Sequence, residues 1–181
     1  MLSTDITNGQ GNTFYVASAG SNNDTLANGG DNGKHPDTPF LTITKALGTA
    51  TSGDTIIVAP GEYQEAFPMT VPDGVTLRGT NLRSTSVKPT NATNDNNAFI
   101  LSGDAHISDL TIKDFFYDSG NDKGYAFVVV SNMNSTQSPY VERITVTTKG
   151  SVVSGSDPYG YAQGDAGRGA LLDGANIASA S

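Results

Sequence analysis

Aromatic and charged side chains gather near the C-terminal end of the chain, between residues 157 and 173. Aromatic rings beside carboxylates suit carbohydrate, because a ring stacks on a sugar while carboxylates accept hydrogen bonds from its hydroxyl groups. Two carboxylates could also hydrolyse a glycosidic bond if the fold held them at a defined separation. The glycines between them predict a flexible loop as the simpler interpretation. The predicted carbohydrate-binding residues are Tyr159, Tyr161, Asp165, Arg168 and Asp173, with Asp157 beside them.

Three aspartates spaced five residues apart form a second candidate site. Asp104, Asp109 and Asp114 carry the oxygen ligands that Ca²⁺ prefers, but calcium needs several such ligands to converge on one point. Aspartates are also common in solvated turns, and this interpretation is favoured. We therefore predict no resident cofactor, with calcium as the alternative.

Two charged pairs lie at similar places in neighbouring predicted strands. Glu142 and Arg143 are expected to lie near Asp109 and Lys113, if the two strands are adjacent. Pairing of opposite charges between strands explains this arrangement more simply than catalysis.

Other chemistries find little support in the residues. His106, beside a strand, is interpreted as a surface or corner residue and His35 as a loop residue beside Pro36, and neither belongs to a recognisable Ser-His or metal-binding motif. The segment GDAGRG lacks the Lys-Ser/Thr pair and the following helix of a phosphate-binding loop. The chain is therefore not predicted to be an enzyme by itself.

Composition narrows the classes of partner. The chain has 10 Lys and Arg against 18 Asp and Glu, a formal charge of −8, which disfavours nucleic acid and anionic membranes. No cysteine is present, so disulfides are excluded. No apolar stretch approaches the length of a membrane span, and the N-terminal residues lack the pattern of a signal peptide. Release by lysis or within a virus particle is the expected route out of a cell.

One short helix is predicted near residues 42–51. Ile43, Ala46, Leu47 and Ala50 follow the spacing of one apolar helix face, and Thr42 suits the N-cap position. After the helix the signal is strand. Short apolar or alternating segments recur at 55–59, 69–71, 75–77, 99–101, 107–112, 127–130, 141–146 and 170–172, after an earlier one at 14–16.

These strands recur at the intervals of a solenoid. Phe99 to Phe127 spans 28 residues and Leu110 to Ile144 spans 34, within the 20 to 50 residues typical of stacked repeats. A β-sandwich is the alternative, but its turns should recur every 8 to 12 residues and it does not need a capping helix. The pattern predicts an all-β fold, a right-handed parallel β-helix whose first coil is covered by the short α-helix.

The predicted organisation is a leader and one domain. Residues 1–12 are expected to be a flexible leader or attachment arm, and residues 13–181 a single β-helix domain. Within it, residues 13–54 form the N-terminal cap and residues 55–181 the first three to four coils. The apolar segment that begins at Ala170 is followed by GANIASAS, which contains no capping pattern. Further coils are therefore expected beyond Ser181.

The N-terminal part resembles a known superfamily. The segments FYVASAGSNNDTLANGG, HPDTPFLTITKALGTATSGDTIIVAPGEYQE and VPDGVTLRG are similar to the start of right-handed β-helix proteins of the pectate-lyase-like superfamily. This resemblance covers roughly residues 13–80. It implies that Gly53-Asp54 makes the helix-to-strand turn, that Pro60-Gly61 makes the next turn with a positive φ at Gly61, and that Asp73-Gly74 and Gly79 mark later corners.

The remaining chain is rich in Asn, Thr, Ser and Gly, and in this composition it resembles structural proteins of tailed phages. This resemblance implies a virion component of the tail-spike or tail-fibre type, located in the tail and extracellular. Its expected partners are copies of itself in a homotrimer, other virion proteins and host surface polysaccharide. Polysaccharide lyases of the superfamily hold Ca²⁺ with carboxylates and use an Arg or Lys base, so a lyase or glycoside hydrolase with catalytic coils beyond residue 181 is one alternative. A bacterial surface structural protein is the other.

Overall fold

The computed structural model describes residues 11–23, 32–90, 97–115, 125–129, 136–148 and 168–172. Within them the chain is built almost wholly of strands, with one short helix, α1 (Ile43–Thr49). This agrees with the predicted all-β class. The strands are β1 (Thr13–Val16), β2 (Thr55–Val58), β3 (Gly61–Glu65), β4 (Met69–Val71), β5 (Thr76–Gly79), β6 (Thr85–Pro89), β7 (Phe99–Leu101), β8 (His106–Phe115), β9 (Tyr125–Val129), β10 (Tyr140–Thr148) and β11 (Arg168–Leu172).

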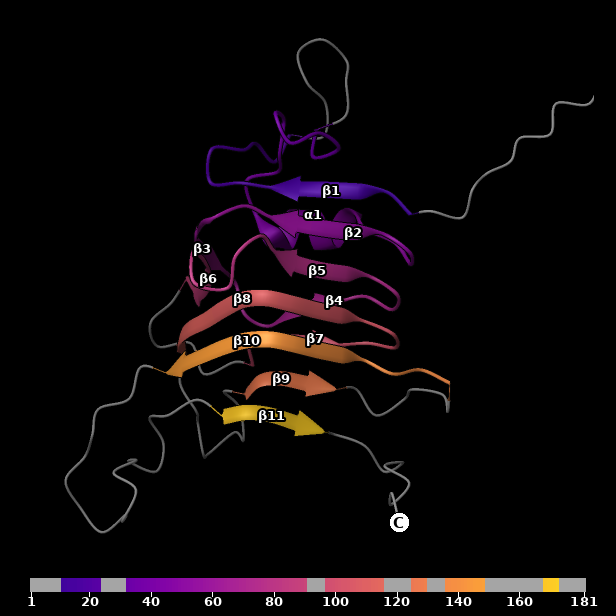
Figure 1. The fold of residues 1–181 in the computed structure, drawn as a ribbon, viewed down its shortest axis with the longest axis vertical. Helices are drawn as coiled ribbons and strands as arrows, with labels where there is room; N and C mark the ends of the chain where they lie inside the picture. The colour runs from indigo at the N-terminus through magenta and orange to yellow at the C-terminus, as the bar shows by residue number, and fades with distance from the viewer. Residues whose placement is uncertain are drawn as a thin grey trace, which may run out of the picture.

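The larger sheet contains seven strands, and all its pairs are parallel. Its order is β1-β2-β5-β8-β6-β3, and β10 pairs with β8. The long strand β8 joins two parts of the sheet, because its first residues pair with β5 and its later residues pair with β6. In Figure 1, β1, β2, β5, β8 and β10 lie one below another with their arrows pointing the same way.

The smaller sheet has the order β11-β9-β7-β4, and its pairs are also parallel. In Figure 1, β4 and β7 lie behind the larger sheet, and β9 and β11 lie below β10. Parallel neighbours cannot be joined by a tight hairpin, so the chain passes through the other strands before it returns to pair with an earlier one.

Both long strands of the larger sheet bend at a residue with positive φ. Asp109 has a φ of 59° and Arg143 has a φ of 48°. Before and after the bend, Ile107 pairs with Val141 and Leu110 with Ile144. Along both β8 and β10, these two inward positions are therefore separated by two residues instead of the usual one. The bend takes up the extra residue, which explains why the apolar alternation in these segments is only partial.

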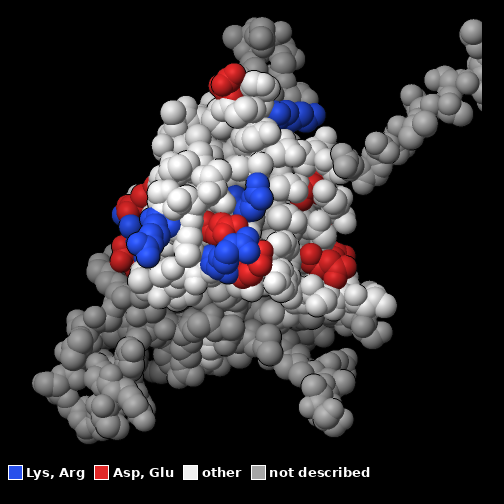
Figure 2. All heavy atoms as spheres, in the orientation of Figure 1, with Lys and Arg blue, Asp and Glu red and all other residues white. Residues whose placement is uncertain are grey.

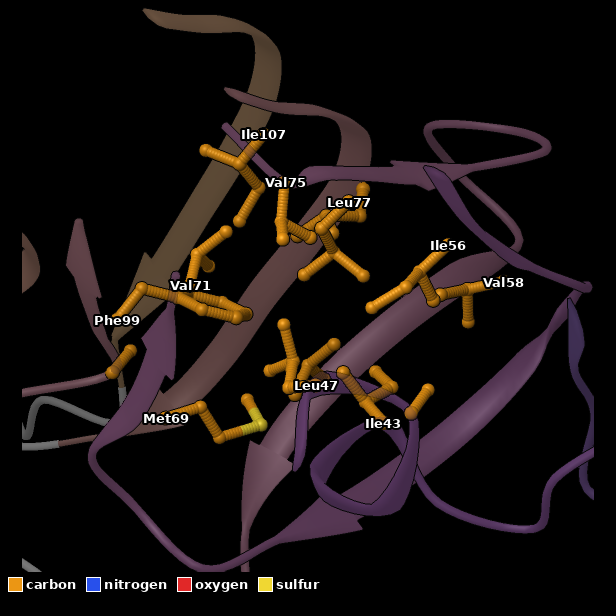
Figure 3. Packing of buried hydrophobic residues seen from close by; sticks show 14 of the residues in the cluster. Ile43, Leu47, Ile56, Val58, Met69, Val71, Val75, Leu77, Phe99 and Ile107 are labelled. Carbon is orange, nitrogen blue, oxygen red and sulfur yellow. The ribbon is translucent and has the colours of Figure 1, made fainter. Parts of the chain in front are cut away.

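The core lies between the two sheets and α1. Buried side chains alternate with outward ones along most strands, such as β2, β6 and β7, whereas four consecutive residues of β9 are buried. Figure 3 shows the side chains of β2 and β5, those of β4 and β7, and those of α1 pointing toward one another. The labelled core residues are Ile43, Leu47, Ile56, Val58, Met69, Val71, Val75, Leu77, Phe99 and Ile107.

Helix α1 is fixed by its first turn as well as by its apolar face. The hydroxyl oxygen of Thr42 accepts a hydrogen bond from Lys45 N at 3.2 Å, which confirms the predicted N-cap. The buried carboxylate of Glu65 in β3 accepts bonds from Ile43 N at 2.7 Å and from the Thr44 hydroxyl at 2.7 Å. Glu65 thereby satisfies amide groups that a helix start leaves without partners. The sequence did not reveal this role.

The predicted turns are confirmed in part. Gly53 has a φ of 91° and Gly74 a φ of 69°, as the turn patterns require. The carboxylate of Asp54 closes the first turn by accepting hydrogen bonds from the backbone amides of Thr51 and Asn12 at 2.7 and 2.6 Å. Burial alone would raise the pKa of Asp54, but these bonds lower it overall. The prediction for Gly61 was wrong, because this residue opens strand β3 without a positive φ.

Candidate functional site

The predicted carbohydrate residues cannot be placed with one another. Tyr159, Tyr161, Asp165 and Asp173 lie outside the described residues. The backbone of Arg168 opens β11 and lies in register with Tyr125 of β9. The proposed role of this segment therefore stays a prediction.

Two of the three candidate calcium ligands have separate partners. Asp109 binds Arg143, and Oδ1 of Asp104 accepts a hydrogen bond from Ser138 N at 2.6 Å. Asp114 lies at a second position with positive φ, near the end of β8. In the part of the chain that the structure describes, no three His, Asp or Glu side chains come close enough to hold a metal ion.

A charged cluster lies at the bend of β8 and β10. Nε of Arg143 donates to Oδ1 of Asp109 at 2.5 Å, and Nη2 donates to Oδ2 at 2.8 Å. Nη1 of the same guanidinium lies 2.8 Å from Oε1 of Glu142. Arg78, one strand further along, adds a second positive charge that acts on Asp109. These four residues, Arg78, Asp109, Glu142 and Arg143, are called the bend cluster below.

The bend cluster arises because the register places its members together. Arg78 of β5 and Glu142 of β10 are each in register with Ser108 of β8, and the two bends lie side by side. The hydrogen bonds from Arg143 are the main cause of a lowered pKa of Asp109. The predicted charge pairing between Asp109 and Arg143 is thus confirmed, and it holds the two bends in one geometry.

A second group of charges lies on the other part of the larger sheet. Oε2 of Glu62 in β3 lies 2.5 Å from Nζ of Lys113 in β8, and Oε1 contacts Nζ of Lys88 in β6. The hydrogen bonds from Lys113 and Lys88 lower the pKa of Glu62. Lys113 was expected near Glu142, but it pairs with Glu62, because the later part of β8 runs beside β6.

An aromatic pair borders the bend cluster. The rings of Tyr140 and His106 are 5.0 Å apart between centroids and inclined at 59°. The Tyr140 hydroxyl donates to Oε2 of Glu142 at 3.3 Å, and Nε2 of His106 lies 3.7 Å from Oε1 of the same carboxylate. Sequence reasoning missed this pair. The two residues stand at the starts of two strands with similar alternation, and this shared position could have revealed the pair.

The face therefore offers an exposed ring and a set of polar groups on rigid strands. Figure 2 shows positive and negative side chains mingled in groups on the side that faces the viewer. The carboxylates of Asp109 and Glu142 each contact a guanidinium, and the hydrogen bonds from Arg143 lower the pKa of Asp109. Carboxylates that are already paired in this way suit recognition of a polar ligand better than proton transfer.

The N-terminal part of the chain is similar to a known family. Residues 25–86 match a family described as protein of unknown function (DUF1565), a domain associated with right-handed β-helix proteins. The matched region includes α1 and strands β2 to β5. No curated protein and no solved structure matches the chain. No helix among the described residues is long and apolar enough to cross a membrane.

Replacing Arg143 with glutamine is expected to raise the pKa of Asp109 toward that of an unpaired aspartate. The guanidinium bonds that favour the ionised carboxylate would be lost. Because the pKa of Asp109 is lower in the folded than in the unfolded chain, its contribution to stability is present above about pH 4 and declines as the pH falls through the folded pKa. NMR titration of the carboxyl carbon should show the shift, with Lys113→Gln as a control that leaves Asp109 unchanged. An unchanged Asp109 titration in Arg143→Gln would contradict the pairing.

Proposed function

We propose that this chain forms the start of a right-handed parallel β-helix that serves as a structural scaffold. The observation that carries the proposal is the repeated order of the strands. The chain passes through β2, β3 and β4 and then through β5, β6 and β7. Strand β5 pairs in parallel with β2, β6 with β3 and β7 with β4, and β5 also pairs with β8. Strand β8 then pairs within both parts of the larger sheet, and β10 pairs with β8. In the smaller sheet, β9 pairs with β7 and β11 pairs with β9.

Several observations support this coil arrangement. Each return to the larger sheet adds a strand next to the previous one, as expected for a solenoid. Connections between parallel strands of one sheet are almost always right-handed, which favours the right-handed form. Helix α1 buries Ile43, Ala46 and Leu47 against the first strands, as a cap would. The match to a family associated with right-handed β-helix proteins points the same way.

We further propose that this scaffold belongs to a phage virion, in a tail spike or tail fibre that adheres to host surface polysaccharide. The resemblance to phage structural proteins supports this role. The paired state of the bend cluster, whose charges fix strand geometry, supports only the structural part of this role. The scaffold would assemble as a homotrimer and attach to other virion proteins.

The test combines size and binding measurements on the full-length protein. We expect light scattering to give the mass of three chains, and immobilised polysaccharides from host surfaces to retain the protein. Retention should be the same with and without a metal chelator, and no unsaturated oligosaccharide should be released. A strict monomer without polysaccharide binding would overturn the proposal. Metal-dependent release of unsaturated products would favour a polysaccharide lyase.

A further inference from the structure

A straight row of outward side chains crosses five strands of the larger sheet. The strand pairings place Thr13, Thr55, Thr76, His106 and Tyr140 in register, one from each of β1, β2, β5, β8 and β10. These strands lie one below another in Figure 1. Neighbouring members are separated by one strand spacing, about 4.8 Å. We call this set the threonine–tyrosine row.

Tyr140, at one end of the row, has the properties of a stacking platform. Its side chain is 54% exposed, more than the exposed apolar side chains of Leu41, Val141 and Val146. The ring is nevertheless held in place, because His106 packs against it and Glu142 accepts a hydrogen bond from its hydroxyl. An exposed aromatic ring with a fixed orientation loses little entropy when a ligand stacks on it.

The groups beside the row favour an uncharged ligand. The bend cluster has two carboxylates, Asp109 and Glu142, and two guanidinium groups, Arg78 and Arg143, so its formal charge is zero. The donors and acceptors of this cluster lie next to Tyr140 and can bond hydroxyl groups. A strongly anionic polymer would find no excess of positive charge here, and the whole chain carries −8.

We propose that a neutral oligosaccharide binds across the strands along the threonine–tyrosine row. One sugar ring stacks on Tyr140, and its hydroxyl groups bond Glu142 and Arg143. Further sugars follow toward Thr76, a half-buried residue on the same row. A pyranose unit is about as long as one strand spacing, so successive sugars meet successive side chains of the row. This inference rests on the proposed adhesion to polysaccharide and assigns it to a place and a sugar class.

The experiment measures binding of the full-length protein to defined probes. The probes are neutral oligosaccharides of glucose, galactose and mannose and, for comparison, oligosaccharides of uronic acids. We expect the best neutral probe to bind Tyr140→Ala at least about tenfold more weakly than the natural protein, a loss of ~1.4 kcal/mol. Tyr140→Phe keeps the ring and should bind within about threefold of the natural protein, since only one exposed hydrogen bond is lost.

Two further variants serve as controls. Leu41→Ala removes an exposed apolar side chain on the cap and should leave binding unchanged. Tyr159→Ala with Tyr161→Ala tests the site predicted from the sequence. Far-ultraviolet circular dichroism of each variant should match that of the natural protein.

The outcomes separate this inference from the proposed function. If the natural protein binds a neutral probe and Tyr140→Ala does so equally well, the row is not the site, although adhesion stands. Binding lost only in the Tyr159 and Tyr161 variant would overturn the inference in the same way, as would binding of uronic acid probes alone. If no probe and no host polysaccharide is bound, both the inference and the adhesive function are wrong.

Discussion

Replacing Gly79 with alanine is expected to lower the free energy of unfolding by about 3 kcal/mol. Gly79 ends β5 at the point where the bend of β8 passes over it. A Cβ there would overlap the carbonyl oxygen of Asp109, and it would lie 3.0 Å from the Asp109 carbonyl carbon and 3.2 Å from Cβ of Thr85. The overlapping atoms belong to the backbone, so no side-chain rotation relieves the clash. Unfolding in urea, followed by circular dichroism, measures the effect.

Gly48 provides the matched control for this substitution. It lies in α1 and is exposed, and a Cβ there would meet nothing within 4 Å. Gly48→Ala should therefore stabilise the chain by up to about 1 kcal/mol, because alanine favours the helix. If Gly79→Ala and Gly48→Ala unfold at the same urea concentration, the close contact between β5 and the bend of β8 is contradicted.

The sequence predicted those elements that depend on local pattern. The helix face of Ile43, Ala46 and Leu47 and the N-cap at Thr42 are determined by nearest neighbours along the chain, and both were found. The bends at Asp109 and Arg143 were not, because left-handed backbone at a residue other than glycine is imposed by the strands on either side. Gly79 was expected at a corner, but its need for glycine comes from Asp109, thirty residues later.

The candidate site was only partly predictable for a similar reason. Pairing of Asp109 with Arg143 follows once β8 and β10 are neighbours, and the sequence predicted that neighbourhood. Lys113 was paired with the wrong strand, because its partner Glu62 becomes adjacent only when β8 continues beside β6. Tyr140 precedes the alternating segment that marked its strand, so the pattern alone did not show that its ring lies on the outer face.

The largest destabilisation among the apolar residues is expected for Phe99→Ala, about 3–5 kcal/mol. Phe99 is completely buried in β7, in register with Met69 of β4 and Phe127 of β9. Its ring stacks on that of Phe127, with centroids 6.2 Å apart and planes at 19°. Removing the ring leaves a cavity, because the neighbouring strands are too rigid to move in and fill it.

Two variants sharpen this prediction. Phe99→Leu retains most of the volume and should cost about 1 kcal/mol. Phe14→Ala removes a ring of the other stacked pair, formed by Phe14 of β1 and Phe40, at the far end of the core. The chain has seven tyrosines and no tryptophan, so tyrosine fluorescence follows unfolding. Because one core cluster includes both phenylalanine pairs, we expect Phe99→Ala and Phe14→Ala each to shift a single common transition. A separate early transition in Phe99→Ala alone would mean that the strands beyond β6 unfold independently of the cap, as weakly coupled repeats do.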